Sequence, residues 1–382
     1  MREPIGLYIH VPFCLSKCPY CDFYSLPYPD TALLDRYTQA VTCALADWRA
    51  RIDAPADTLY FGGGTPSLLG GKRLAAVIEA AARHFGLSGA EITLEANPAD
   101  DLAGVFRAFA AAGGNRVSLG MQSASDRELE KLGRRHRHAQ TLRAAEDLHA
   151  AGIDNLSLDL MLGIEEQSPD SLADSIEACR QLGASHVSAY LLKIEEGTPF
   201  HARRDSLRIP DDDGMAALYL QACRQLEAAG FRQYEISNFA RPGRCSRHNS
   251  KYWDLQPYLG IGPSAHSFLD GRRFFYPRDL SGFLEGAAPL PEDPEDSRIP
   301  DGSEAEYLML RLRLTEGADE SAYRRRFGRP LPAAFRQRAE QLARQCSGRW
   351  LQCDEEGVRL TSEGFLLSNA IIARLLGEAI RG

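Results

Sequence analysis

The sequence lacks a long apolar run, a surplus of positive charge and a context suited to disulfides. No uninterrupted apolar stretch approaches the roughly 20 residues that a membrane-spanning helix needs, and no apolar leader precedes the first expected strand. The formal net charge of −8 argues against a nucleic acid or an anionic membrane held by overall charge. Nine cysteines without a secretion signal argue against a disulfide framework. We therefore expect a soluble, cytoplasmic protein with no nucleic-acid partner and no membrane span, for which peripheral membrane association stays open.

The sequence does contain a regular alternation of short apolar runs with amphipathic stretches. The amphipathic stretches carry apolar residues at three- and four-residue spacing, which predicts helices. Strand and helix repeated in this way predict right-handed crossovers and a parallel sheet. Six such units predict an α/β fold with a partial (βα)6 barrel of the TIM type, open rather than closed. The predicted strands cover residues 6–12, 58–64, 91–97, 116–122, 155–162 and 186–194.

The composition changes after about residue 270. Residues 286–304 are rich in Pro, Asp and Glu, which is typical of a linker. Beyond them, helical patterns surround two short strands at 350–361, which predicts a small α+β domain that resembles a winged helix. We therefore predict a core of residues 1–270, a linker of residues 271–304 and a C-terminal domain of residues 305–382.

Three cysteines follow the first predicted strand with the spacing C-x3-C-x2-C, at Cys14, Cys18 and Cys21. Zinc sites favour paired C-x2-C units with further ligands, which this loop does not supply. Three thiolates on one loop can hold three irons of a cubane iron–sulfur cluster and leave the fourth iron open. Unrelated thiols or a site for another soft metal are the alternatives. The other six cysteines are scattered singly, as is typical of small buried apolar residues.

Several words of the sequence resemble the radical S-adenosylmethionine (SAM) superfamily. Within it, the likeness is to the group of oxygen-independent coproporphyrinogen III oxidase and its haem-chaperone relatives, and "LTSEGFLLSNAIIARLL" resembles the C-terminal domain of that group. The resemblance implies a [4Fe–4S] cluster on the three cysteines, SAM on the open iron, and an electron donor such as flavodoxin or ferredoxin. The words that carry it are "YIHVPFC", "GGGTPS", "LEANP", "NRVSLGMQS", "LGRRH", "YEISNFA", "HNSKYW" and "GIGPSAHS".

The resemblance also implies which side chains contact SAM. Carboxylates suit ribose hydroxyls and an amino group, arginine suits a carboxylate, and glycine lets a ligand approach the backbone closely. The polar members follow predicted strands, at the edge where parallel α/β folds bind ligands. The residues expected at SAM are Tyr8, Tyr20, Gly63, Gly64, Thr65, Glu95, Gln122, Arg134 and Asp159.

Two features favour the haem-chaperone branch. The porphyrinogen-oxidising members resemble C-x3-C-x2-C-x-C, whereas this chain has Phe23 at the last position. The word "HNSKYW" resembles a motif of the chaperones that has been proposed to engage haem. Imidazole is a good axial ligand of haem iron, and Tyr252 and Trp253 could pack on the macrocycle, so His248 is the first candidate ligand. His266 is the competing candidate because it lies near the expected mouth of the site.

Three further histidines have less specific expectations. His10 lies on the first strand and is expected to support the cluster. His136 and His138, in the basic run "GRRHRH", are expected to be solvated or to meet haem propionates. No catalytic residue is assigned.

One loop departs from the group. Relatives have a sequence like "DLIYGLPGQT", whereas residues 159–168 here are "DLMLGIEEQS". The shape of the loop from Gly163 to Ser168 is therefore open, although Asp159 is kept.

The expected function is haem binding and transfer to an acceptor, such as a respiratory haem protein. The first alternative is SAM-dependent oxidative decarboxylation of coproporphyrinogen III. The second is an interaction protein whose cluster is only structural.

Overall fold

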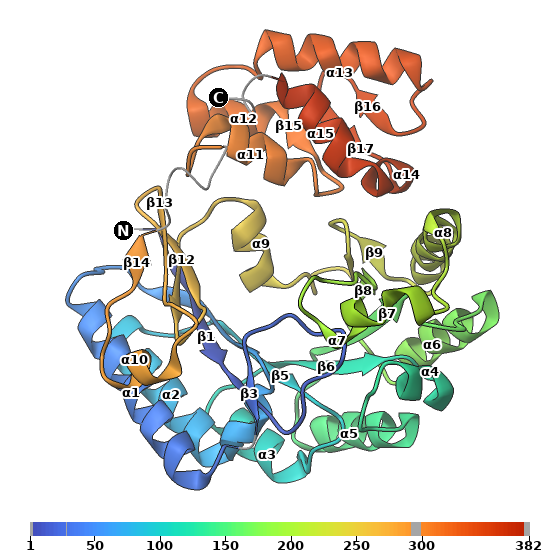
Figure 1. Ribbon diagram of the computed structural model, residues 1–382. Helices are drawn as coiled ribbons and strands as arrows, with labels where there is room; N and C mark the ends of the chain where they lie inside the picture. The colour runs from blue at the N-terminus through green and yellow to red at the C-terminus, as the bar shows by residue number, and fades with distance from the viewer. Residues whose placement is uncertain (1–2, 28, 292–298, 378–382) are drawn as a thin grey trace.

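The computed structural model describes residues 3–27, 29–291 and 299–377. A curved twelve-stranded sheet contains strands at all six predicted places, and its helices cover the outer side (Figure 1). Its order is β14-β13-β12-β11-β1-β4-β5-β6-β7-β8-β10-β9, and the described strands do not close into a ring. The six predicted strands are β1 (Ile5–Val11), β4 (Ala56–Gly63), β5 (Glu91–Ala96), β6 (Arg116–Gln122), β7 (Leu156–Leu162) and β8 (His186–Leu191).

The prediction missed a seventh parallel strand, β11 (Tyr258–Ile261), which pairs with β1. Its four residues are too short for a clear apolar run, and its partner lies about 250 residues earlier, so local pattern could not reveal it. Antiparallel strands extend both edges of the sheet. These are β12 (His266–Leu269), β13 (Arg272–Phe275) and β14 (Leu290–Pro291) on one side, and β9 (Arg232–Gln233) and β10 (Asn238–Ala240) on the other.

The crossover helices pack their apolar stripes on the outside of this sheet. Asp30 accepts from the Leu33 N–H at the N-terminus of the first of them, as preferred capping residues do. The longer helices are α1 (Thr31–Arg49), α2 (Gly70–Phe85), α3 (Ala103–Ala111), α5 (His138–Ala150), α6 (Pro169–Gln181) and α8 (Asp212–Ala228). The shorter ones are η1 (Pro66–Leu69), α4 (Asp126–Lys131), α7 (Pro199–Ala202), η2 (Arg204–Ser206), α9 (Arg247–Trp253) and α10 (Leu280–Leu284).

The two faces of the parallel strands differ, because successive side chains of a strand point to opposite sides. Leu7 and Ile9 of β1 are fully buried in the main hydrophobic core. Tyr8 and His10, between and after them, take the other face and bond to each other. The inner face of the barrel is therefore a lumen lined with polar side chains, which is the part of the fold that positions the site.

The stretch from 271 to 291 is not a linker, which corrects that part of the prediction. It carries β13, α10 and β14, which belong to the sheet and its flank. Runs of Pro, Asp and Glu indicate that a segment is exposed, but they do not distinguish a linker from an edge strand, which is also exposed and tolerates these residues. The most acidic part, residues 292–298, lies outside the described residues.

The C-terminal module is α+β, as predicted. It has a three-stranded sheet in the order β15-β17-β16 with helices around it, and the predicted pair of strands at 350–361 forms a hairpin. No helix among the described residues is long and apolar enough to cross a membrane. The elements are α11 (Glu304–Arg311), β15 (Ala318–Asp319), α12 (Glu320–Phe327), α13 (Ala333–Gln345), β16 (Leu351–Cys353), β17 (Gly357–Leu360), α14 (Ser362–Leu366) and α15 (Ser368–Leu376).

Candidate functional site: a cysteine loop over a polar lumen

The cysteine loop follows β1 at the carboxyl edge of the parallel strands. Cys14 ends β2 (Phe13–Cys14), which pairs in parallel with β3 (Leu26–Pro27), and this pairing closes the loop at its base. Cys18 and Cys21 lie between, joined by a 3.0 Å hydrogen bond from the Cys21 N–H to the Cys18 carbonyl. All three thiols are free and partly exposed. The loop can therefore present three sulfurs from one short segment.

Two donors from elsewhere in the chain reach these sulfurs. The Thr65 hydroxyl lies 3.6 Å from Cys14 Sγ, and Arg134 Nη1 lies 3.5 Å from Cys18 Sγ. Both donors therefore point at sulfurs of the cysteine loop. No three His, Cys, Asp or Glu side chains in the described ranges are close enough to hold one metal ion. A cubane cluster offers a separate iron to each cysteine, so its ligands need not meet at one point, and the donor set fits it.

The glycine loop after β4 packs directly against the cysteine strand. A Cβ on Gly64 would lie 2.5 Å from the Phe13 carbonyl oxygen, and one on Gly63 would lie 2.8 Å from the His10 ring. Backbone hydrogen bonds from Gly64 to Val11 and from Thr65 to Phe13 hold this contact. Gly63 and Gly64 were expected to let a ligand approach closely. Their packing against His10 and Phe13 already requires glycine at both positions.

His10 connects the lumen to the cysteine loop. Its Nε2 lies 3.1 Å from the Tyr24 carbonyl, which can only accept, so Nε2 carries the proton. Nδ1 then accepts from the Tyr8 hydroxyl at 3.1 Å. Burial lowers the pKa of His10 to about 4, so the ring is neutral at pH 7. The predicted support of the cluster region by His10 agrees with this geometry.

The predicted SAM carboxylates lie near each other on the lumen face of the sheet. Glu95 accepts a 2.7 Å hydrogen bond from the Tyr60 hydroxyl, and Asp159 accepts a 3.1 Å bond from Ser118. Burial raises the pKa of Glu95 to about 7 and that of Asp159 to about 6. Glu95 and Ser118 are direct partners in the sheet, so adjacent strands β5, β6 and β7 bring these groups together.

Arg134 and its neighbours complete the cluster of predicted residues. Besides Cys18, Arg134 donates from Nη2 to the Gly120 carbonyl at 2.9 Å. Gln122 ends β6 with φ of 66°, where the strand register shifts. Tyr20 packs edge-on against Phe200 with ring centroids 6.1 Å apart, and burial raises the pKa of its hydroxyl. The structure therefore brings the predicted SAM residues to the lumen and its carboxyl edge.

The sequence prediction missed several residues of the lumen. All but Tyr60, which lies on β4, alternate with other residues in "RVSLGMQ", "LSLDLML" and "HVSAYL". We interpreted these strands as near-continuous apolar runs, whereas the period of two was the available signal of a polar inner face. The missed residues are Tyr60, Arg116, Ser118, Ser157, His186, Ser188 and Tyr190.

His248 lies at the opposite end of the barrel from the cysteine loop. It is 1% exposed, with Nδ1 2.8 Å from the Thr58 hydroxyl and Nε2 2.7 Å from the Tyr252 hydroxyl. Thr58 and Glu91 are near the amino ends of their strands, and Glu91 accepts from the backbone N–H groups of Arg247 and His248. Burial lowers the pKa of His248 to about 3.

This geometry argues against His248 as the first candidate haem ligand, which stays a prediction. Both of its ring nitrogens already bond to protein hydroxyls, and Tyr252 is committed to His248 and stacks edge-on against Tyr258 at 4.6 Å. Trp253 is partly buried at the end of the same helix, α9. The motif "HNSKYW" folds as a short helix that closes the floor of the lumen, a role that a local sequence match could not distinguish from ligand binding.

His266, the competing candidate, lies at the carboxyl edge of the barrel, whereas His248 lies at its floor. It begins β12 just after β11 reaches the carboxyl edge, and its side chain is exposed. Its ring stacks on Phe275 with centroids 5.4 Å apart and planes at 22°. His266 and Arg278 both lie near enough to His10 to lower its pKa, which places them beside the cysteine loop.

The basic run after α4 is less solvated than predicted. His136 is 1% exposed and its Nε2 lies 3.1 Å from the Met121 carbonyl, while burial lowers its pKa to about 4. His138 begins α5, and its backbone N–H bonds to Asp126. His136 is therefore a buried structural histidine, which corrects the expectation that it is solvated or meets propionates.

The departing loop at 163–168 is held by its own side chains. Gln167 accepts from the Gly163 N–H at 2.7 Å and donates to the Met161 carbonyl at 3.0 Å. Glu165 and Glu166 both pair with Lys131 of α4, at 3.4 and 3.3 Å. The acidic pair thus anchors the loop to a neighbouring helix.

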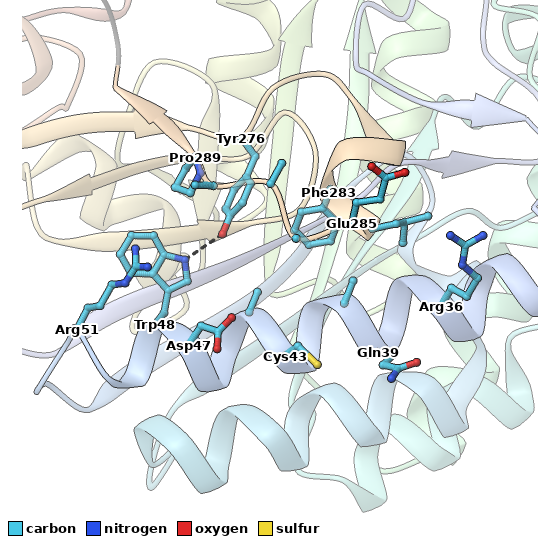
Figure 2. A pocket seen from close by; sticks show the side chains of 16 residues that line it. Arg36, Gln39, Cys43, Asp47, Trp48, Arg51, Tyr276, Phe283, Glu285 and Pro289 are labelled. Carbon is cyan, nitrogen blue, oxygen red and sulfur yellow. Dashed lines mark hydrogen bonds between the residues drawn. The ribbon is translucent and has the colours of Figure 1, made fainter.

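A pocket on the outside of the barrel contains none of the predicted site residues. It lies between α1 and α10, where Trp48 donates a 3.0 Å hydrogen bond to the Tyr276 hydroxyl (Figure 2). The helix α1 separates this pocket from the inner face of the sheet.

Comparison with known proteins agrees with the fold and the cysteine loop. The family model described as the radical SAM superfamily matches residues 8–179, and the HemN C-terminal domain matches residues 305–367. The solved coproporphyrinogen III oxidase (HemN) of Escherichia coli superposes with a TM-score of 0.80 at 20% identity, covering 98% of this chain and 90% of that one. The class is therefore a radical SAM fold with a HemN-type C-terminal domain.

Curated relatives are similar over nearly the full chain. Heme chaperone HemW of Mycobacterium tuberculosis (strain H37Rv) is 39% identical over 384 residues, which cover 98% of this chain and 95% of the relative. Those of Escherichia coli (strain K12) and Bacillus subtilis are 35% and 32% identical, covering 98% and 97% of this chain and 99% of each relative. The chain belongs to the HemW family of the radical SAM superfamily, which confirms the resemblance found in its sequence.

Proposed function

We propose that the protein is a haem chaperone that binds haem at the carboxyl edge of its barrel and transfers it to an acceptor haem protein in the cytoplasm or at a membrane surface. The curated relatives are named heme chaperones, and they match this chain from end to end. The observation that carries the proposed site is the exposed His266 beside the cysteine loop.

A [4Fe–4S] cluster and SAM belong to this proposal. Cys14, Cys18 and Cys21 would hold the cluster, which would supply an electron to the sulfonium of SAM. Thr65 and Arg134 would support the cluster through the sulfurs they contact. Glu95, Gln122 and Asp159 would meet SAM from the lumen. An electron donor such as flavodoxin or ferredoxin is needed only if SAM is cleaved, and it stays a prediction.

His266 is the proposed ligand of haem iron. An imidazole stacked on Phe275 is held in one orientation, which suits an axial ligand. Arg278 lies on the same side and is exposed, so its guanidinium can meet a propionate carboxylate. Phe23 is 66% exposed on the cysteine loop, where an aromatic ring can pack on a porphyrin face.

The test is haem titration of the reconstituted protein, followed through the Soret band. Wild type should develop a protein-bound Soret band, and His266→Ala should shift it and weaken haem binding by tenfold or more, about 1.4 kcal/mol. His248→Ala is the comparison, because its ring is buried at the floor. It should lower thermal stability but keep the position of the band in the folded fraction. A Soret band that His248→Ala changes and His266→Ala does not would show that His248 of α9 is the ligand of haem iron.

Oxidative decarboxylation of coproporphyrinogen III is tested on the same preparation. Anaerobic assay with SAM, a reductant and the porphyrinogen should give no protoporphyrinogen. Robust turnover would overturn the chaperone proposal. Protein that binds neither SAM nor haem, but keeps its cluster and fold, would favour a purely structural cluster.

A further inference from the structure

The floor of the lumen contains a buried cation without a bonded partner. Arg116 begins β6 and is 2% exposed, and its Nε and Nη1 have no hydrogen-bond partner among the described residues. A charge buried without hydrogen bonds or a counter-ion is costly, so proteins seldom keep one without a use. The architecture of the sheet does not require arginine here, since the neighbouring inward position on β5 is Thr93.

Arg116 lies on the lumen face of the sheet, two residues nearer to the amino ends of the strands than the level of Glu95. Its sheet partner is Thr93, and two residues further along β6 Ser118 is the partner of Glu95 and donates to Asp159. The guanidinium acts on both carboxyl groups, lowering the pKa of each against the effect of burial. The charge of Arg134 also lowers the pKa of Asp159, whereas Arg116 is the cation that lowers the pKa of Glu95.

The two histidines around this cluster are not cations. Burial and the Arg116 charge lower the pKa of His186, and burial, the Lys251 charge and the Arg116 charge lower that of His248, so both rings are neutral. Burial raises the pKa of the Tyr8 and Tyr60 hydroxyls, so both are neutral. The groups that face Glu95 are Tyr8 of β1, Tyr60 of β4, Arg116 of β6, Asp159 of β7 and Tyr190 of β8; those that face Arg116 also include His186, Tyr234 and His248.

We propose that Arg116 is a positioning residue for SAM: its charge favours the carboxylate forms of Glu95 and Asp159, so that the lumen offers more negative charge to the cationic end of SAM. The inference rests on the SAM site of the proposed function. Without Arg116, burial and the mutual repulsion of the two carboxylates would keep protons on them up to a higher pH. A protonated carboxyl group would then bind the amino and sulfonium charge less strongly.

The experiment measures SAM binding to the cluster-reconstituted protein by anaerobic equilibrium dialysis between pH 6 and pH 9. Wild-type affinity should fall as the pH drops through about 7 and about 6, where Glu95 and Asp159 take up protons. Arg116→Gln should move this fall upward by about one pH unit and weaken binding about tenfold at pH 7, with recovery at pH 9. Arg116→Lys should keep the wild-type profile.

Two further variants separate electrostatics from structure. Thr93→Val removes an unpartnered buried hydroxyl beside Arg116 without changing charge, and it should leave the pH profile unchanged. Arg116→Met should keep or raise the thermal midpoint, because it removes an unpaired buried charge. Lower midpoints in both neutral variants would make Arg116 a structural residue and overturn the inference.

Affinity lost equally at pH 6 and pH 9 would overturn it as well. Wild-type protein that binds no SAM would instead overturn the SAM part of the proposed function.

Discussion

At the scale of single residues, Glu95 is proposed to bind SAM in its charged form, whereas its burial makes the neutral form the more stable one. Burial raises its pKa to about 7, from an ordinary value of 4.5. Between these two values the folded chain keeps a proton that the unfolded chain has released. The contribution of Glu95 to stability therefore falls as the pH rises through this window.

Glu95→Gln removes this conflict. The variant should gain thermal stability over wild type, and the gain should be larger at pH 8 than at pH 5. Thermal melts of the cluster-free protein at both pH values measure it. Glu79→Gln is the control, because Glu79 is exposed on α2 and should change neither midpoint. An equal gain at both pH values would contradict a titrating, buried Glu95.

The site residues show what the sequence could and could not predict. The three cysteines, Glu95 and Asp159 were expected together because parallel strands end at one edge. The structure places Asp159 in the middle of β7 rather than at its end. Arg116 was missed because it lies at the start of its strand, whereas ligands of parallel α/β folds are expected at the carboxyl ends. The burial of His248 was not predictable because a motif shows which residues occur together and not which way a side chain points.

At the scale of elements, α9 holds the floor of the barrel through many small contacts. Glu91 accepts from two backbone N–H groups at its N-terminus, and Ser246 accepts from Asn249. The buried Lys251 donates to the Pro4 carbonyl at 3.1 Å and pairs with Asp57 at 2.9 Å. These contacts join the helix to the amino ends of β1, β4 and β5.

Glu91→Gln tests the anchoring of α9. It removes the charge that faces the helix N-terminus and one of the two acceptors, so the free energy of unfolding should fall by about 1–2 kcal/mol. Urea denaturation measures the change, and Glu79→Gln again serves as the exposed control. Equal midpoints for wild type and Glu91→Gln would show that α9 is held mainly by its side chains.

At the scale of the whole molecule, the end of α9 also contacts the C-terminal module, which lies above α9 in Figure 1. The buried Arg311 pairs with Asp254, directly after α9, and with Glu316. Arg326 donates to the carbonyls of Asp254 and Leu255, both at 3.2 Å. The barrel and the module are thus expected to unfold together.

Arg311→Ala should weaken this coupling. We expect a loss of about 1–3 kcal/mol and a calorimetric transition that broadens or splits, because the buried arginine bridges the two parts. Arg325→Ala removes an exposed arginine of α12 and should leave a single transition. A single, unshifted transition in Arg311→Ala would show that other contacts suffice.

The domain arrangement was partly predictable for a physical reason. Strand and helix patterns are local, so the parallel core and the small α+β module could both be expected. Pairing between distant segments is not local, and the chain from β11 to β14 was therefore assigned wrongly in part. The contacts of α9 with both parts depend on tertiary packing alone.

The helix α9 lies across the amino ends of the strands and closes that end of the lumen. The edge that carries the cysteine loop and His266 is then an entrance to Glu95 and Asp159. If haem is seated at that edge, it stands between SAM and bulk water. The order in which the two ligands arrive and leave then becomes a property of the fold, because the first to enter is the last to be released.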